Sequence, residues 1–165
     1  MQMRTSKNLD KLKFQSQKCR KWCWAAVAAM ISSFYDGATS FTQCEIASNT
    51  LNEPRCCTDC IVCNIEFDLD PALCTVNRFK PPVNGILSKT ELMDKTDSET
   101  PVCVGIRYTD IDGHFVAVKG YDNRMAGKLF LLISDPERGE LIMLFEEFRD
   151  RFRGKGKWTN SYFTG

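Results

Sequence analysis

The segment WCWAAVAAMISSFY, residues 22–35, predicts the central element of the fold. Its alanines favour a helix, and its large apolar side chains are spread around most of the helical circumference. A helix that is apolar on nearly every side is a buried one, and its small alanines let neighbouring elements approach closely. Asp36-Gly37 supplies a stop, because glycine adopts the left-handed conformation in which many helices end.

Further helices are predicted on the C-terminal side of this segment. The pattern over Thr42–Leu51 is amphipathic and predicts a second helix. Residues 52–85 combine cysteines, prolines and acidic residues without a sustained hydrophobic period, so we expect a loop-rich region there. Ser88 and Glu91 have the spacing of a capping box, which predicts a short helix from there to Lys95.

From Pro101 onward the hydrophobic pattern becomes typical of strands. We predict strands over Val102–Tyr108, His114–Tyr121, Lys128–Ser134, Glu140–Phe145 and Lys157–Phe163, with a turn at 109–113 and a short helix at Glu146–Phe152. Helices followed by antiparallel strands indicate an α+β domain.

Length and composition indicate one globular domain over residues 1–165. The chain has a mass of 18.8 kDa with 43% hydrophobic and 26% charged residues, which excludes a disordered tail, a collagen-like chain and a coiled coil. The longest apolar run, near Ala25–Ile31, is too short for a membrane span. A formal net charge of +1 predicts no nucleic-acid partner, and nothing in the pattern indicates an oligomeric state.

The basic residues are concentrated near the two ends of the chain. The N-terminal arm, residues 1–16, is basic and lacks the apolar segment of a secretory signal. Basic residues also occupy every second position from Arg149 to Lys157, which an extended segment would place on one face. We favour a charged, solvated strand edge over a surface that binds an anionic partner.

The chain contains nine cysteines, which favour disulfide bonds over a metal site. Besides Cys23, they are Cys19, Cys44, Cys56, Cys57, Cys60, Cys63, Cys74 and Cys103. The run Cys57-x2-Cys60-x2-Cys63 has zinc-ligand spacing, but it lacks a paired C-x2-C arrangement and a supporting histidine. We therefore expect disulfides, no metal and no cofactor, with different partners for the adjacent Cys56 and Cys57. Disulfides point to export, by a route that needs no visible signal peptide.

Three residues suited to cysteine-based catalysis lie at the ends of predicted helices and strands. Cys23 lies at the start of the buried helix, where unpaired N–H groups and the helix dipole favour a thiolate. His114, the one histidine of the chain, opens a strand and is the sole base available to a cysteine nucleophile. Asp135 follows another strand and can orient the imidazole. The structural alternatives are a buried cysteine, a strand-face histidine and an Asp-Pro turn.

Gln17 is the candidate donor to the oxyanion of a tetrahedral intermediate. It precedes Cys23 on the loop that enters the helix, from where its amide can point at the oxygen beside the Cys23 N–H. Gln15 is the rival candidate, and a solvated glutamine is the structural alternative.

The segment QKCRKWCWAA, residues 17–26, resembles the Gln-x5-Cys-Trp-Ala segment of papain-like cysteine proteases. GHFVAVKGY, residues 113–121, and Ser134-Asp135-Pro136 are similar to the histidine strand and the acidic third position of the compact bacterial branch. That branch includes plant-pathogen effector proteases and is similar to bacteriocin-processing peptidases. The paired tryptophans are the most specific part, and Asp135 departs from the Asn of plant papains.

The resemblance implies a papain-like fold, with the catalytic helix packed on a C-terminal antiparallel sheet. It implies Cys23 as nucleophile, His114 as base and acid, Asp135 as orienting group and Gln17 as oxyanion donor. We expect a cysteine peptidase that hydrolyses protein or peptide substrates through a thioester, as an exported bacterial effector. The alternatives are a glutamine deamidase or transglutaminase using the same residues, and a non-catalytic cysteine-rich metal-binding module.

Overall fold

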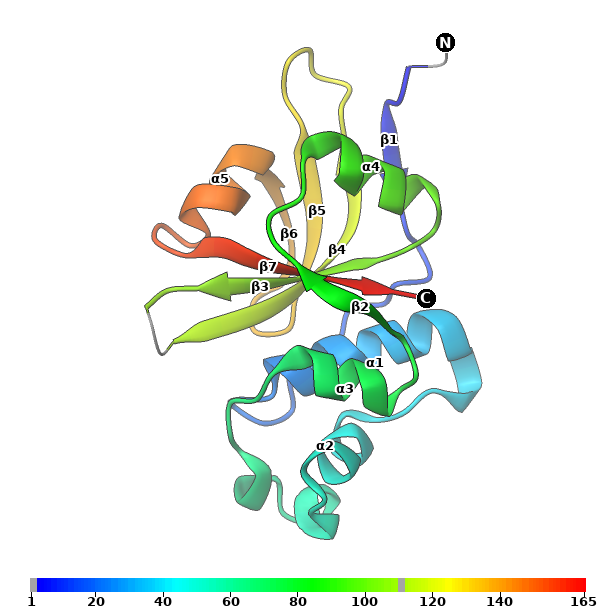
Figure 1. The fold of residues 1–165 in the computed structure, drawn as a ribbon, viewed down its shortest axis with the longest axis vertical. Coiled ribbons are helices and arrows are strands. Elements are labelled where there is room, and N and C mark those ends of the chain that lie inside the picture. The colour runs from blue at the N-terminus through cyan, green and yellow to red at the C-terminus, as the bar shows by residue number, and fades with distance from the viewer. Residues whose placement is uncertain (1–2, 110–111) are drawn as a thin grey trace.

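The computed structural model describes residues 3–109 and 112–165. They form helices and one antiparallel sheet whose strands differ in length. The α-helices are α1 (Cys23–Asp36), α2 (Gln43–Leu51), α3 (Leu69–Thr75), α4 (Lys89–Asp97) and α5 (Phe145–Arg151). The strands are β1 (Ser6–Asn8), β2 (Phe79–Asn84), β3 (Val102–Arg107), β4 (Gly113–Asp122), β5 (Phe130–Asp135), β6 (Gly139–Leu144) and β7 (Lys157–Thr164). Helices α1, α2 and α3 gather at one end of the molecule and the sheet occupies the other (Figure 1). The α+β prediction is confirmed.

The order of the strands brings two distant parts of the chain together. The sheet runs β2-β7-β3-β4-β5-β6, with β1 paired to β4. Because β4 and β5 are antiparallel, the start of one lies beside the end of the other. The pairing of Ala117 with Ser134 sets the register, so that His114 and Asp135 lie at the same end of the sheet. The predicted turn at 109–113 includes residues 110–111, and the predicted arm includes residues 1–2, which lie outside the described residues.

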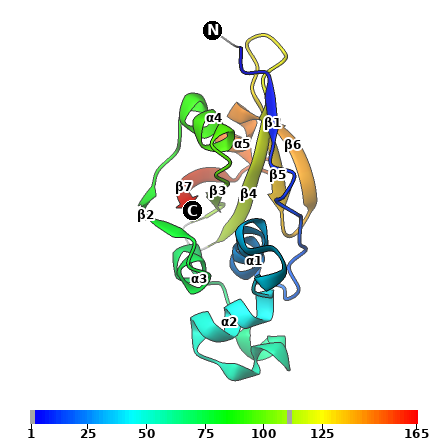
Figure 2. The ribbon, with the colours of Figure 1, turned by 90° about the vertical axis from the view of Figure 1, so that its right-hand side faces the viewer.

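Side chains of the sheet alternate between two hydrophobic cores. Cys103 and Ala117 face the core that contains α1, and α1 lies against β4 (Figure 2). Val102, Val104 and Val116 face the other core, which contains residues of α4 and α5. The sheet is therefore covered on both faces, with the cysteine-bearing helix on one of them.

Helix α1 is buried, as its sequence predicts. Every residue from Cys23 to Ser32 is buried. Gly37 ends the helix with a φ of 55°, a conformation that glycine adopts without a steric penalty. The capping box predicted at Ser88 and Glu91 is also present, at the start of α4.

Segment 52–85 is more regular than predicted. It contains short 3-10 helices at Pro54–Cys57 and Cys60–Cys63, followed by α3 and β2. Helix α3 has 7 residues, too few to show a hydrophobic period. Strand β2 includes Pro81 and Pro82, which favour a loop in the sequence but are tolerated here because β2 is an edge strand.

Disulfide bonds connect α2 and the 3-10 helices. They join Cys44 to Cys57 and Cys56 to Cys63, so the adjacent cysteines have different partners as predicted. Free thiols are found at Cys19, Cys23, Cys60, Cys74 and Cys103. Within the described residues, no group of three or more His, Cys, Asp or Glu side chains is placed to hold a metal ion. No helix in that part of the chain is long and apolar enough to cross a membrane.

The basic residues of 149–157 do not line one face of a strand, so that prediction is wrong. Phe145, Phe148 and Phe152 are buried at helical spacing, which favours α5 over an extended segment. The chain then turns tightly before β7 begins. Arg153, in this turn, points inward and pairs with the last residue of β5 instead of facing solvent.

Candidate active site

Cys23 is held at the first position of α1 by the two tryptophans beside it. Trp22 Nε1 donates to the carbonyl of Cys63 at 2.8 Å, and Trp24 Nε1 donates to the carbonyl of Ile65 at 3.0 Å. Both bonds reach the disulfide-bonded segment and its continuation, so the start of α1 is anchored on both sides of the thiol. The first turn of a helix is the end at which backbone N–H groups lack intrahelical partners and the helix dipole is positive.

Cys23 and His114 line the same open cleft, which has a volume of about 430 Å³. Residues 66–68, just before α3, form one wall, and parts of β3, β4 and β7 form the other. The two residues are 9% and 5% exposed respectively. Each therefore presents only a small part of its surface to a molecule in the cleft.

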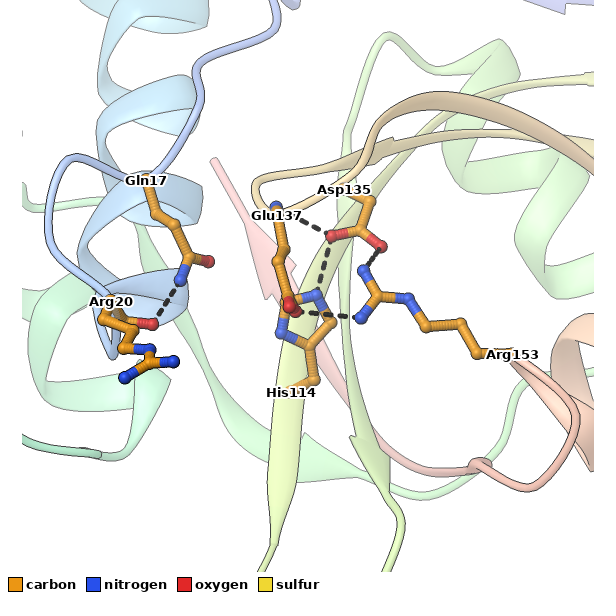
Figure 3. A network of polar contacts seen from close by, with 6 residues as sticks. All are labelled: Gln17, Arg20, His114, Asp135, Glu137 and Arg153. Atoms are coloured by element: carbon orange, nitrogen blue, oxygen red, sulfur yellow. Dashed lines mark hydrogen bonds and ion pairs between the residues drawn. The ribbon is translucent and has the colours of Figure 1, made fainter.

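His114 is placed between the thiol and the carboxylate of Asp135. Its Nε2 lies 2.7 Å from Asp135 Oδ1 (Figure 3). Cys23 lines the same cleft and acts electrostatically on the imidazole; since Nε2 is engaged by Asp135, Nδ1 is the ring nitrogen left to face the thiol. The ring of Phe152 lies nearly parallel to the imidazole, with centroids 6.4 Å apart, and supports its orientation.

The surroundings of His114 favour its protonated form. Burial alone lowers the pKa of the imidazole, but hydrogen bonds and charges from Asp135 and Cys23 outweigh it and raise that pKa to about 9. His114 is thus an imidazolium at neutral pH. Because this value lies above the ordinary 6.5, the charged contacts stabilise the folded state below pH 6.5, and that contribution is lost as the pH rises through about 9.

Asp135 ends β5 as a fully buried carboxylate with several partners. Oδ1 accepts from the His114 ring and from the backbone N–H of Glu137 at 2.9 Å, and Oδ2 accepts from Arg153 Nη2 at 2.5 Å (Figure 3). Burial raises the pKa of Asp135, but the hydrogen bond and charge of His114, assisted by the Glu137 N–H and Arg153, lower it below its ordinary value. Asp135 is therefore ionised and fixed toward the imidazole.

Gln17 lies on the opposite side of the imidazole from Arg153 (Figure 3). Its backbone N–H donates to the carbonyl of Pro136 at 2.9 Å, which ties its loop to the residue after Asp135. One hydrogen of its side-chain amide is held by the Arg20 carbonyl at 2.5 Å, and an amide nitrogen carries a second hydrogen. Its Oε1 is buried without a hydrogen-bond partner.

Gln15, the rival candidate, is engaged elsewhere. Its Oε1 accepts from Gln43 Nε2 at 3.2 Å, on α2. The structure thus places Cys23 and His114 on one cleft and pairs His114 with Asp135, with Gln17 on the other side of the imidazole from Arg153.

Sequence reasoning missed Arg153 and Glu137 at this site. Glu137 follows Asp135 closely, and Arg153 lies in a turn between α5 and β7. No local pattern marks either residue, because their meeting depends on the packing of α5 against β7 and on the turn after β5. The basic residues at every second position from 149 to 157 instead predicted side chains exposed to solvent, Arg153 among them.

The protonation of His114 gives a direct test of this geometry. The chain has one histidine, so its ring-proton NMR signal needs no assignment. We expect this signal to titrate near pH 9, and at a lower pH in Cys23→Ala, because the contact with Cys23 is one of those that raise the pKa. Cys103→Ala, which alters a buried thiol in β3, should leave the midpoint unchanged. A wild-type midpoint at or below 6.5 would contradict the arrangement.

Comparison with known proteins identifies the family. The family described as papain-like cysteine protease AvrRpt2 matches residues 5–153. The crystal structure of a protein described as a C39-like peptidase from Bacillus anthracis is similar, with 16% identity over 96% of this chain and 98% of that chain, and a TM-score of 0.58. At this identity the likeness concerns the fold alone. Curated protein sequences give no match. Since the family match spans most of its length, the chain belongs to the AvrRpt2 family of papain-like cysteine proteases.

Proposed function

We propose that this protease cleaves peptide bonds with Cys23 as nucleophile, His114 as base and acid, and Asp135 as the orienting group. The observation that carries the proposal is the position of His114. It lines an open cleft together with Cys23, whose charge acts on its imidazole, and it pairs with Asp135 at 2.7 Å. This is the arrangement that a thiol nucleophile requires: a base within reach, itself oriented by a third group.

The reaction follows from the charges at the site. The Cys23 thiolate attacks the carbonyl carbon of a peptide bond, and the resulting oxyanion is stabilised by the Cys23 N–H and the Gln17 amide. The C–N bond breaks as the His114 imidazolium gives its proton to the leaving amine. The neutral imidazole then takes a proton from water as the water oxygen attacks the thioester. The C–S bond breaks, releasing the carboxylic acid and restoring the Cys23 thiolate beside the His114 imidazolium.

We also propose that the protein acts after export, as an effector. The two disulfide bonds support this, because such bonds persist in oxidising compartments and are rare in the cytosol. They close the segment to which Trp22 and Trp24 are anchored, so reduction should loosen the support of Cys23.

A peptide library tests the proposed reaction. Purified protein is incubated with the library at pH 6 and new N-termini are identified by mass spectrometry, while released ammonia is measured in parallel. We expect new N-termini without ammonia. Ammonia without new N-termini would instead indicate deamidation or transamidation by the same thioester.

A chemically blocked sample is the control for this experiment. Iodoacetamide at pH 5.5 should modify Cys23 faster than the exposed Cys74, because the thiolate has a protonated His114 beside it. Burial raises the pKa of Cys19 to about 11 and also raises that of Cys103, so both should stay unmodified. Modification of Cys23 should remove all cleavage. Cleavage by protein fully modified at Cys23 would exclude it as the nucleophile.

A further inference from the structure

We propose that Arg153 is a positioning residue of this site, which holds Asp135 ionised and aimed at His114 throughout the reaction. The inference rests on the proposed function and extends the predicted triad by a fourth, cationic member. It assigns a role to the one residue of the basic run that turns away from solvent.

Arg153 forms ion pairs with two carboxylates, and one of these pairs is buried. Nη2 lies 2.5 Å from Asp135 Oδ2, and Nη1 lies 2.8 Å from Glu137 Oε2. The side chain of Arg153 is 12% exposed and that of Asp135 is 0% exposed, so this pair is shielded from solvent. The Glu137 side chain is 53% exposed, so its ion pair with Arg153 contributes little to stability by itself. The contact of Arg153 that is shielded from solvent is therefore the one between Nη2 and the Asp135 carboxylate.

The chain fixes Arg153 by a tight turn. Phe152 donates its N–H to the Gly156 carbonyl at 2.7 Å, closing the turn on both sides of Arg153. Arg153 has a φ of 51° and Gly154 a φ of 86°, so two successive residues are left-handed. A Cβ on Gly156 would lie 2.9 Å from the Phe152 carbonyl oxygen, which requires glycine there.

The same turn supports His114 as well as Asp135. Phe152 stacks beside the imidazole, and the Arg153 guanidinium lies 5.4 Å from the centroid of the Phe152 ring. Tyr108 stands close enough for the charge of Arg153 to act on its phenol, so among the described residues Glu137, Asp135 and Tyr108 are the titratable groups that act on the guanidinium. This one turn therefore contacts both His114, through Phe152, and Asp135, through Arg153.

The reaction gives Arg153 a specific task. When His114 passes its proton to the leaving amine, Asp135 loses its charged neighbour while remaining buried. A buried carboxylate without a cation tends to take up a proton, and a protonated Asp135 no longer accepts from His114 in the same way. Arginine remains charged at every relevant pH, so Arg153 keeps Asp135 ionised in this step.

The test compares Arg153→Met, Arg153→Lys and a control, Arg151→Met. Arg151 is 69% exposed and pairs with Glu147 on the surface of α5, so its loss should leave activity unchanged. We expect Arg153→Met to lower kcat by roughly 10- to 100-fold on the best-cleaved library peptide, as for other partners that orient a reactive group, with little change in KM. Arg153→Lys, which keeps the charge without the planar fork, should recover part of that loss.

Two pH readouts separate positioning from mere support of the fold. In Arg153→Met the acid limb of kcat should move to higher pH, because Asp135 loses a cation that lowers its pKa. The NMR signal of His114 should report the protonation of Asp135 at a higher pH in Arg153→Met than in wild type, because the cation that lowers the pKa of Asp135 is gone. If Arg153→Met does not fold, Arg153→Lys must show a reduced kcat, because it keeps the charge but loses the planar fork that holds the carboxylate in place.

Wild-type kcat and an unshifted acid limb in a folded Arg153 variant would overturn the proposal. The NMR readout does not need turnover. If wild type cleaves nothing and the Asp135-linked inflection of His114 still moves to higher pH in Arg153→Met, the proposed function fails while the electrostatic link stands. If wild type cleaves peptides and neither readout changes, the link alone fails.

Discussion

Replacing Cys23 or His114 by alanine is expected to lower peptide cleavage by about 10⁶-fold, and the double variant should be no slower than either single one. The three measurements agree because the two residues act as a unit. Without the imidazole the thiol is not activated, and without the thiol the imidazole has no nucleophile to serve. Initial rates on one library peptide, compared with wild type, give the three values.

Retention of the fold is the condition for this interpretation. Cys23→Ala removes one atom at a helical position that already neighbours Ala25 and Ala26, so thermal unfolding should change little. Cys103→Ala is the matched control, because Cys103 is likewise a buried, unpaired cysteine but lies in β3. It should keep its activity. An equal loss of cleavage in Cys103→Ala would contradict the specific role of Cys23. Additive losses in the double variant would contradict the view that Cys23 and His114 act together.

The sequence predicted those features that depend on local pattern. The continuous apolar surface of 22–35 predicted a buried helix, and α1 is buried through its first three turns. Alternation predicted β3, and the Ser88–Glu91 spacing predicted the start of α4. These features follow from side-chain periodicity and capping, which act within a few residues.

Features that depend on contacts between distant segments were not predictable. The partners of Cys56 and Cys57 are set by how the 3-10 helices pack against α2. Strand β2 takes two prolines because it lies at the edge of the sheet, which the sequence does not reveal. Arg153 reaches Asp135 only because α5 and the following turn pack beside the end of β5. Candidate catalytic residues were therefore easier to find than the residue that supports them.

Asp135→Asn is expected to lower cleavage by roughly 10²- to 10⁴-fold, less than either alanine variant above. An amide still accepts from the His114 ring, so part of the orientation survives. The loss comes from the missing charge: without it the pKa of His114 falls, and fewer molecules carry the imidazolium at neutral pH. Rates measured from pH 5 to 9 should show this as a lower basic limit of activity. An unchanged rate and profile would remove Asp135 from the site.

The same substitution should also destabilise the fold, by about 3–5 kcal/mol, because it leaves the shielded Arg153 without its buried counter-charge. Adding Arg153→Met to Asp135→Asn removes that stranded charge. We therefore expect the double variant to regain stability in thermal and urea unfolding while cleavage stays at or below the level of Asp135→Asn. The second substitution would then restore stability without restoring cleavage. If the second substitution instead lowered stability by the same amount in both backgrounds, Arg153 and Asp135 would not be coupled.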